Sequence, residues 1–545
     1  MNKISAILAG MVFTVSSSGQ QVLLTTAEKT NYESTSTYND VISFINKLKT
    51  VSANIRVETI GKTTEGRDLP LLIIANPMPG NPSDLTKDKR VVVYIQANIH
   101  AGEVEGKEAT LMFARDILNE TKPAILNDII FLICPVFNAD GNEKFSKENR
   151  TYQNGPVNGV GVRYNGQFLD LNRDAMKAES PEIQGVITNV LLKWDPAVVM
   201  DCHTTDGSYH IEPTTFTWMV NPSGDNNLIA YMSRKMVPAM SSTLLNKYKV
   251  DNCFYGEFVD MLAPEKGWIF DASEPRYFTN YVGIRNRLAI LNENYVYADF
   301  KSRVNGCYWL IWSLADFLSE HRDEIRTIIR EADNRTIGRG LNPSVSDSFA
   351  IAYEVKPEPN PVTIKTFEAE LASDINGRKS YKKTDRQKNV SVPYLIDYFP
   401  VKKVRFPFAY ILNTFDQQIL KNLMIHGIRM EKLGMKEKLI VEGFRINDLK
   451  GAQRLNQGHY NDIVKGEYVK DTLEFQAGTM IIRTAQPLAN LAAYLLEPET
   501  NDGLLTWNYF DKYLVPQWGG GFNPYPVYRV IERKEIKTVP VIRGN

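Results

Sequence analysis

The stretch Val91–Glu103 (VVVYIQANIHAGE) joins a strand-like run, 91–97, to two candidate metal ligands, His100 and Glu103. A continuous apolar run of this kind is typical of a strand buried on both faces of a parallel sheet. Residues 104–119, which follow, have helical spacing. In open α/β sheets, ligands gather at the carboxyl ends of the strands. The stretch therefore predicts a ligand site at the end of a buried strand.

The same alternation continues through the first half of the chain. Strand-like runs occupy 69–75, 128–136, 196–202 and 287–293, and helix-like segments occupy 39–50, 181–192 and 308–332. Residues 334–346 resemble a helix exit and a linker. The alternation predicts an α/β domain over residues 25–335, with a mixed, mostly parallel sheet flanked by helices.

The second half has a different character. Its β-branched and aromatic runs are separated by Pro, Gly and Asn, which predicts a β-rich accessory region of one or two domains over residues 347–545. Only two helices are expected there. One has Asp416 as its N-cap and ends at His426, with Gly427 as the left-handed cap residue, and the other starts at Pro487.

The first residues are arranged like a targeting segment. Lys3 precedes the apolar run 4–15, and small residues 16–19 follow it. This order predicts a secretory signal peptide over residues 1–19, although a buried first helix is the alternative. We therefore expect a secreted or periplasmic protein.

Charge, hydropathy and cysteine content argue against a nucleic-acid binder, an internal membrane span and a thiolate zinc site. Lys plus Arg and Asp plus Glu are both 63, so the chain lacks the basic excess of a nucleic-acid binder. No apolar stretch after the N-terminus has the length of a membrane span. The four cysteines could form two disulfides, although Cys134 and Cys202 lie in apolar runs and resemble buried thiols. No Cys-x-x-Cys motif indicates a thiolate zinc site.

A third ligand completes the candidate metal site. His203 ends the strand-like run 196–202, about a hundred residues after His100. Two His and one Glu leave a coordination position open for water, as in catalytic zinc sites. A second His-x-x-Glu, His321–Glu324, lies among charged residues of a helix and is interpreted as a solvated face.

Several ordered motifs agree with this site, and together they resemble the zinc carboxypeptidases related to carboxypeptidase A, over roughly residues 36–330. The motifs are His100-x-x-Glu103 with His203, the strand 287–293 ending in Glu293, Pro135–Gly141, Asp170-Leu-Asn172-Arg173, Arg150, and Gly61–Arg67. The resemblance implies one Zn²⁺ per catalytic domain, held by His100, Glu103 and His203.

The resemblance also implies roles for other residues. Glu293 would be the general base and acid, although it could instead pair with Arg285 or Arg287. Asn172 and Arg173 would bind the terminal carboxylate of the substrate. The remaining assignments are Arg150 polarising the scissile carbonyl, with Arg163 as the alternative, Asp170 supporting His100, and Tyr277 or Tyr281 as the mobile tyrosine of the family.

One departure concerns the carboxylate pocket. The family's Asn-Arg-Asn is Asn172-Arg173-Asp174 here, which adds a negative charge that could disfavour an anionic C-terminus or be neutralised by Lys177. The prediction is a secreted zinc metallocarboxypeptidase that acts on peptide or protein C-termini. The alternatives are a zinc amidohydrolase that acts on γ-D-glutamyl bonds of cell-wall peptides, and an inactive binding module.

Overall fold

The computed structural model describes residues 22–541, apart from 83, 84, 86, 120–122, 206 and 374–378. The predicted signal peptide, residues 1–19, lies outside the described residues. Within the described ranges, no helix combines the length and the hydrophobicity that crossing a membrane requires.

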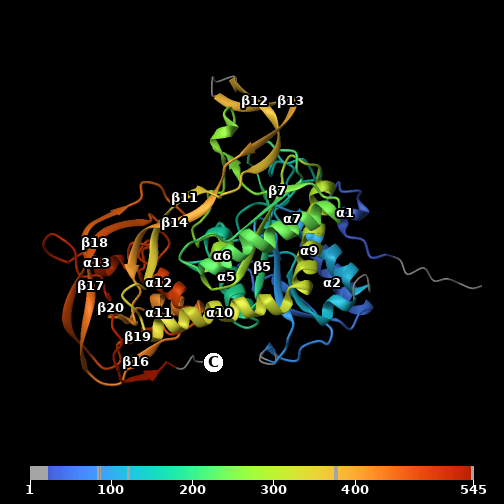
Figure 1. Ribbon diagram of the computed structural model, residues 1–545. Helices are drawn as coiled ribbons and strands as arrows, with labels where there is room; N and C mark the ends of the chain where they lie inside the picture. The colour runs from blue at the N-terminus through green and yellow to red at the C-terminus, as the bar shows by residue number, and fades with distance from the viewer. Residues whose placement is uncertain are drawn as a thin grey trace, which may run out of the picture.

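An eight-stranded sheet in the order β1-β2-β4-β3-β5-β10-β6-β7 is the centre of the first half (Figure 1). Four central strands are parallel: β4 (Ile129–Cys134), β3 (Val91–Ala97), β5 (Val198–Thr205) and β10 (Leu288–Tyr295). Antiparallel pairing joins β2 (Asp68–Ile74) to β4, β1 (Ile55–Lys62) to β2, and β6 (Thr214–Trp218) to β10, whereas β7 (Asn252–Phe254) runs parallel to β6. The predicted mixed, mostly parallel sheet is confirmed.

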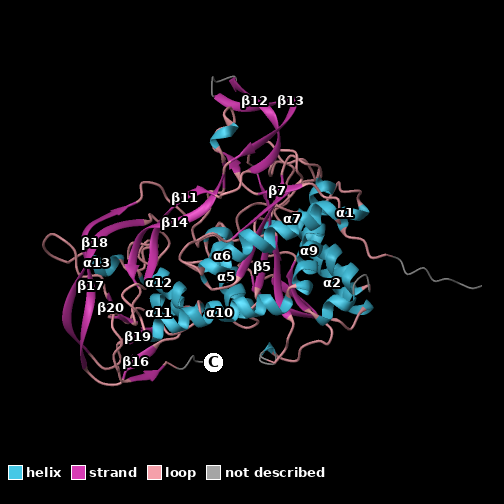
Figure 2. Cartoon of the chain, viewed as in Figure 1, coloured by secondary structure: helices cyan, strands magenta, loops and turns pink. Residues whose placement is uncertain are grey.

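Helices flank this sheet (Figure 2). The main ones are α2 (Tyr38–Val51), α3 (Glu105–Leu118), α5 (Pro181–Val186), α6 (Asn226–Tyr231), α7 (Val237–Asn246), α8 (Phe278–Ile284), α9 (Phe300–Glu320) and α10 (Arg322–Leu341). Short helices α1 (Thr26–Lys29) and α4 (Ala139–Asn142) lie in the connections. Helix α3 packs against α9.

The predicted helix over 308–332 is two helices, and its predicted exit is helical. The break falls at His321, between α9 and α10, and α10 continues to Leu341. Its buried face consists of Ile325, Ile329, Ala332, Thr336 and Gly340. The last three are small or polar, so they give no apolar periodicity, although they recur at helical spacing and pack closely.

Among the described residues, three more sheets lie wholly or partly in the second half. A four-stranded sheet has the order β11-β14-β9-β8, with β11 (Ser348–Pro357), β14 (Tyr394–Arg405), β9 (Trp268–Ile269) and β8 (Glu257–Phe258). Strands β12 (Val362–Ser373) and β13 (Lys379–Val392) form a two-stranded sheet. The seven-stranded sheet consists of β18 (Asp462–Phe475), β17 (Glu437–Gly451), β20 (Val527–Val530), β15 (Ala409–Leu412), β19 (Met480–Arg483), β16 (Glu431–Leu433) and β21 (Thr538–Pro540).

The two helices expected in this half are present. Helix α11 (Gln417–Ile425) has Asp416 as its N-cap, and Gly427 follows it with φ 84°. The helix predicted from Pro487 is α12 (Ala489–Leu496), and a further short helix, α13 (Asp511–Leu514), also forms. The domain boundaries stay a prediction. The two halves are nevertheless joined, because β14 pairs with β9 and one hydrophobic cluster includes residues from both.

Candidate active site

A tight loop between β3 and α3 carries the first two candidate metal ligands. Asn98 takes a positive φ of 66°, and its side-chain amide donates to the carbonyls of Ala101 and Glu103 at 3.1 and 3.0 Å. Position 102 favours glycine because the Arg150 side chain lies close to it: a Cβ there would be 2.5 Å from Cδ of Arg150. The loop therefore fixes His100 and Glu103 at the carboxyl end of β3.

The three predicted ligands converge. The Glu103 carboxylate lies 3.1 Å from Nδ1 of His100 and 3.0 Å from Nδ1 of His203, and all three residues are buried. Ligands of one tetrahedral zinc lie about 3.3 Å apart, so these spacings fit zinc after a small adjustment. Two imidazoles and a carboxylate are also the donor types that catalytic zinc uses.

A carboxylate backs each histidine on the side away from Glu103. His100 Nε2 lies 2.9 Å from Asp170, as the resemblance implies, and His203 Nε2 lies 3.1 Å from Asp201. The sequence analysis missed the role of Asp201. Its position two residues before His203 on one strand was the available signal, because such residues share a face of the sheet. Such outer partners fix the tautomer and orientation of a ligating imidazole.

The charges of the site also favour a cation. Burial opposes ionisation of Glu103, yet His100 and Arg150 hold its pKa well below the usual range. Burial likewise opposes ionisation of Asp170, but His100 and Arg163 hold its pKa far below the usual range. Both carboxylates therefore stay ionised, which suits a divalent cation between the imidazole Nδ1 atoms.

Glu293 lies beside these ligands. It is the register partner of His203 in the parallel pair β5–β10. Neighbouring strands lie about 4.8 Å apart, and paired residues share a face of the sheet. Glu293 and two of the three ligands, His100 and Glu103, line one cavity of about 220 Å³.

The wall of this cavity also contains most of the other predicted site residues. The complete lining is His100, Glu103, Arg150, Arg163, Asn172, Arg173, Thr204, Thr205, Tyr255, Phe270, Asp271, Ala272, Tyr277, Thr279, Asn280, Leu291 and Glu293. Three arginines thus face two glutamates across a small space. The sequence predictions did not include Tyr255, Phe270 or the threonines, because single residues of these types carry no motif.

The segment that follows Asp170 is held by its neighbours. The Asn172 amide oxygen accepts from the main-chain N–H of Phe278 at 2.9 Å, and the Arg173 guanidinium lies 4.3 Å from the ring centre of Tyr277. Asp174 is fully buried and pairs with Lys177 at 2.6 Å. The extra negative charge is therefore neutralised by Lys177, and Asp174 does not line the cavity.

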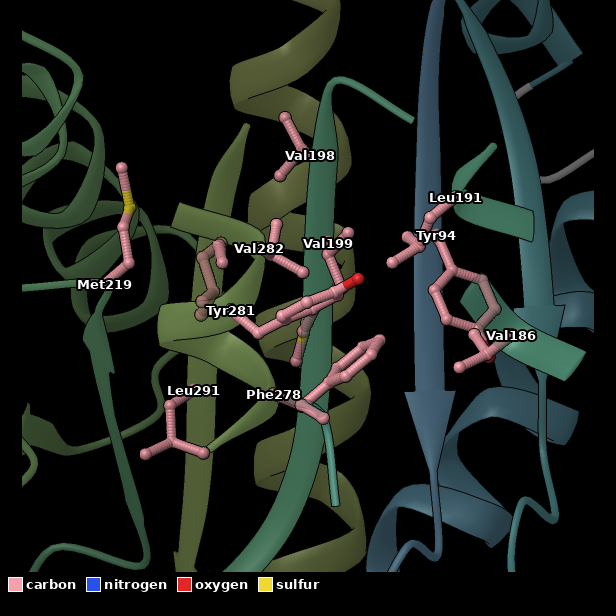
Figure 3. Packing of buried hydrophobic residues seen from close by; sticks show 14 of the residues in the cluster. Tyr94, Val186, Leu191, Val198, Val199, Met219, Phe278, Tyr281, Val282 and Leu291 are labelled. Carbon is pink, nitrogen blue, oxygen red and sulfur yellow. The ribbon is translucent and has the colours of Figure 1, made fainter. Parts of the chain in front are cut away.

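Tyr281 lies elsewhere. It is fully buried on α8, and its hydroxyl lies 2.8 Å from Nδ1 of His426. In Figure 3 its ring packs beside Val199 and Phe278 in the core. Tyr277 is the N-cap of α8 and has an extended backbone, so it lies outside the helix, whereas Tyr281 lies within the helix and is buried. Of the two tyrosines proposed for substrate binding, only Tyr277 lines the cavity.

The second half of the chain reaches the rim of this site. Gln457, in the loop between β17 and β18, accepts from the main-chain N–H of Asp170 at 2.7 Å. The Asp502 carboxylate accepts from the main-chain N–H of Arg276 at 2.9 Å, and it also lies 2.8 Å from Nε of the same arginine. Arg276 adjoins Tyr277. Residues far along the sequence thus support both the segment after Asp170 and the Arg276–Tyr277 segment of the cavity wall.

Comparison with known proteins agrees with this geometry. Residues 41–263 match the family model described as zinc carboxypeptidase. The chain carries a zinc carboxypeptidase domain. It is therefore assigned to the enzyme class of zinc metallocarboxypeptidases. The matched range includes the three metal ligands and Asn172–Arg173, and it ends before Glu293.

Relatives of this zinc carboxypeptidase domain carry corresponding names. Carboxypeptidase 2 of Trichophyton rubrum is 21% identical over 494 residues, which cover 86% of this chain and 81% of the relative. Carboxypeptidase 2 of Trichophyton equinum is 21% identical over 500 residues, with the same coverage. Among solved structures, a metallo-carboxypeptidase from Burkholderia cenocepacia has 15% identity and a TM-score of 0.38, covering 52% of this chain and 69% of that one. Carboxypeptidase A from Helicoverpa armigera has 18% identity and a TM-score of 0.39, covering 54% and 75%.

Loss of either outer carboxylate should weaken metal binding by the zinc carboxypeptidase domain. We expect Asp170→Asn and Asp201→Asn each to lower zinc affinity about 10–100-fold, because each removes the negative charge beside Nε2 of a ligating imidazole. Competition with a chromophoric chelator measures the affinity. Asp323→Asn, beside the second His-x-x-Glu copy, is the control. Unchanged affinity in both site variants would contradict the assignment.

Proposed function

We propose that the chain is a secreted zinc-dependent metallocarboxypeptidase that hydrolyses the C-terminal peptide bond of peptides or proteins. The observation that carries this proposal is one cavity shared by metal ligands, Glu293 and the Asn172–Arg173 pair. A cavity of about 220 Å³ suits the end of a chain and one terminal side chain. Secretion rests on the predicted signal peptide, and N-terminal sequencing of the exported protein tests it.

In the proposed reaction, zinc held by His100, Glu103 and His203 would lower the pKa of water and polarise the scissile carbonyl. Glu293 accepts a proton from the attacking water and later returns it to the leaving amine. Asp170 and Asp201 keep the two imidazoles in the tautomer that presents Nδ1 to the cavity. The buried position of these groups limits competition from bulk water.

Two arginines compete for the role at the developing oxyanion. The guanidinium of Arg150 is engaged by the protein at every nitrogen, donating to Gln153, Glu103 and the Thr204 carbonyl at 2.9, 3.0 and 3.2 Å. Arg163 donates from Nε to Asp170 at 2.8 Å, and its NH1 lies 3.8 Å from Glu103. The resemblance favours Arg150, whereas the geometry favours Arg163, because fewer of its donors are already committed.

Conservative substitution separates these two assignments. If Arg163 stabilises the oxyanion, Arg163→Lys should lower kcat about 10²–10³-fold with little change in zinc content. Arg150→Lys should then act through its ligand partner Glu103 and lower zinc affinity instead. Steady-state kinetics at saturating zinc and metal titration measure the two effects. The opposite pattern would return the role to Arg150.

The terminal carboxylate is assigned to Asn172 and Arg173. Arg173 offers a planar fork of donors that suits a carboxylate, and the ring of Tyr277 fixes its plane. Asn172 is anchored by its bond to Phe278, which leaves its amide nitrogen available for the substrate. This pair would therefore select substrates with a free C-terminal carboxylate.

The test uses the zinc-loaded full chain on peptides that differ in one property at a time. Free-acid and amidated forms of the same peptide are compared, with terminal Phe, Arg and Glu, and a cell-wall muropeptide is included. Mass spectrometry should show stepwise loss of C-terminal residues from free-acid peptides alone. Arg173→Ala should abolish most of the preference for the free acid. Cleavage of the muropeptide alone would support the amidohydrolase alternative, and no turnover at full zinc content would support a binding module.

A further inference from the structure

A second cluster of metal-binding residue types lies outside the catalytic cavity. It consists of His210 and Glu212, in the loop after β5, and Cys253, on β7. One donor atom from each lies within 4.8 Å of the other two. The three residues are 3%, 2% and 7% exposed, so the cluster is closed to bulk water.

The polar groups of this cluster are poorly compensated. Nδ1 of His210 is buried without a hydrogen-bond partner and lies 3.7 Å from the Glu212 carboxylate. That carboxylate accepts from the main-chain N–H groups of Lys365 and Ile211 at 3.0 and 3.3 Å. Among the described residues, no Lys or Arg side chain forms a salt bridge with Glu212, since Lys365 itself pairs with Asp251. Burying an imidazole nitrogen without a hydrogen-bond partner, next to a carboxylate without a cation, lowers the stability of the fold.

Burial shifts the ionisation of all three groups toward their neutral forms. It lowers the pKa of His210 to about 3 and raises the pKa of Glu212 and of the Cys253 thiol. A neutral imidazole is ready to donate its lone pair, whereas the thiol would release its proton when a cation binds. A divalent cation would thus compensate the negative charges of the Glu212 carboxylate and of the thiolate that forms when Cys253 releases its proton.

We propose that His210, Glu212 and Cys253 bind a second zinc ion, separate from the catalytic one. The set offers one nitrogen, one oxygen and one sulfur, and a thiolate favours zinc over magnesium or calcium. Ligands of one zinc lie about 3.3–3.8 Å apart, so the donor atoms need to draw together by about 1.5 Å at most. A water or a main-chain carbonyl would complete the fourth position.

Packing and strand pairing hold two of the three proposed ligands, His210 and Cys253, in place. The His210 ring lies against Tyr295, with ring centres 3.7 Å apart, and meets Trp268 edge-on at 6.1 Å. Its orientation is therefore set by packing before any ion binds. Cys253 occupies the middle of β7 and is paired with Thr215 of β6. Preorganised donors of this kind lower the cost of binding.

The location assigns a structural role to this zinc. Glu212 is bonded to the main chain of Lys365 on β12, the Ile211 N–H donates to the Lys365 carbonyl at 2.9 Å, and His210 bridges to Thr366. The ion would thus fasten β7, at the edge of the catalytic sheet, to the loop of residues 210–212, which is itself bonded to β12 of the β12–β13 hairpin. This site could not be predicted from the sequence, because Cys253 lies 43 residues after His210 and belongs to no Cys-x-x-Cys motif.

Cobalt substitution of the full chain tests this site directly. The catalytic ligands include no cysteine, so a thiolate-to-cobalt charge-transfer absorption reports on the second site alone. We expect about two equivalents of zinc or cobalt per chain after dialysis, measured by elemental mass spectrometry, together with that absorption band. One equivalent and no band in the unaltered protein would overturn the proposal, whatever the variants do.

Matched variants locate the band. Cys253→Ala and Glu212→Gln should each bring the metal content to about one equivalent, and Cys253→Ala should abolish the band. Cys134→Ala, at another fully buried thiol, should leave both unchanged. Glu103→Gln should remove the catalytic equivalent and keep the band, which separates this proposal from the proposed peptidase function. Retention of two equivalents and the band in Cys253→Ala would overturn it.

Discussion

Replacement of Glu293 by Gln should lower kcat about 10²–10⁴-fold while the enzyme keeps its zinc. The amide has almost the shape of the carboxylate, but it cannot accept the proton of the attacking water, and that is the usual contribution of a general base. Glu293 lies beside His203 in the strand register and lines the cavity. The other carboxylates of the wall are Glu103, a proposed metal ligand, and Asp271, which is exposed.

The kinetics must be read together with metal content. Peptide hydrolysis is followed under saturating substrate, and zinc is counted on the same sample. Glu331→Gln, an exposed position on α10, is the matched control. A variant at position 293 that loses its zinc would assign Glu293 to the ligand set, and one that keeps full kcat would exclude it as the base.

Replacement of Glu103 by Gln should remove both zinc and activity. The carboxylate is the group that both Nδ1 atoms face, and Arg150 also donates to it. Its loss takes away a ligand and the negative charge that balances the cation. We therefore expect the fall in zinc affinity to exceed the 10–100-fold typical of an outer partner, and hydrolysis at limiting zinc to reach the background rate.

The other His-x-x-Glu copy supplies the control for this experiment. Glu324→Gln alters the same residue type at the same spacing from a histidine, but on a helix surface where Glu324 pairs with Lys235. It should leave zinc affinity and hydrolysis unchanged. Excess zinc should rescue part of the activity of Glu103→Gln, and wild-type affinity in that variant would exclude Glu103 as a ligand.

The features that could be predicted from sequence depend on local pattern. The run 91–97 is strand β3 with the same bounds, because a strand buried on both faces must be apolar throughout. Helix α11 was predicted to within one residue at its end, since Asp416 and Gly427 are strong capping signals. The metal ligands were recognisable because they follow such strands.

The features that could not be predicted depend on tertiary packing. The end of α10 buries Ala332, Thr336 and Gly340, whose small size suits a close contact but gives no hydrophobic signal. Tyr281 has the residue type of a substrate-binding group, and only the packing of α8 against the sheet places it in the core. The role of Asp201 needed the structure as well, because a carboxylate on a buried strand has many uses.

The bond between Gln457 and the Asp170 main chain has a practical consequence. A loop of the β17–β18 hairpin holds the backbone of a residue that supports a metal ligand, although 287 positions separate the two. A proteolytic nick, an affinity tag or an inserted reporter in this loop would therefore disturb catalysis rather than act as a harmless surface change. The hairpin is distant in sequence from the reacting atoms, yet its tip functions as part of their scaffold.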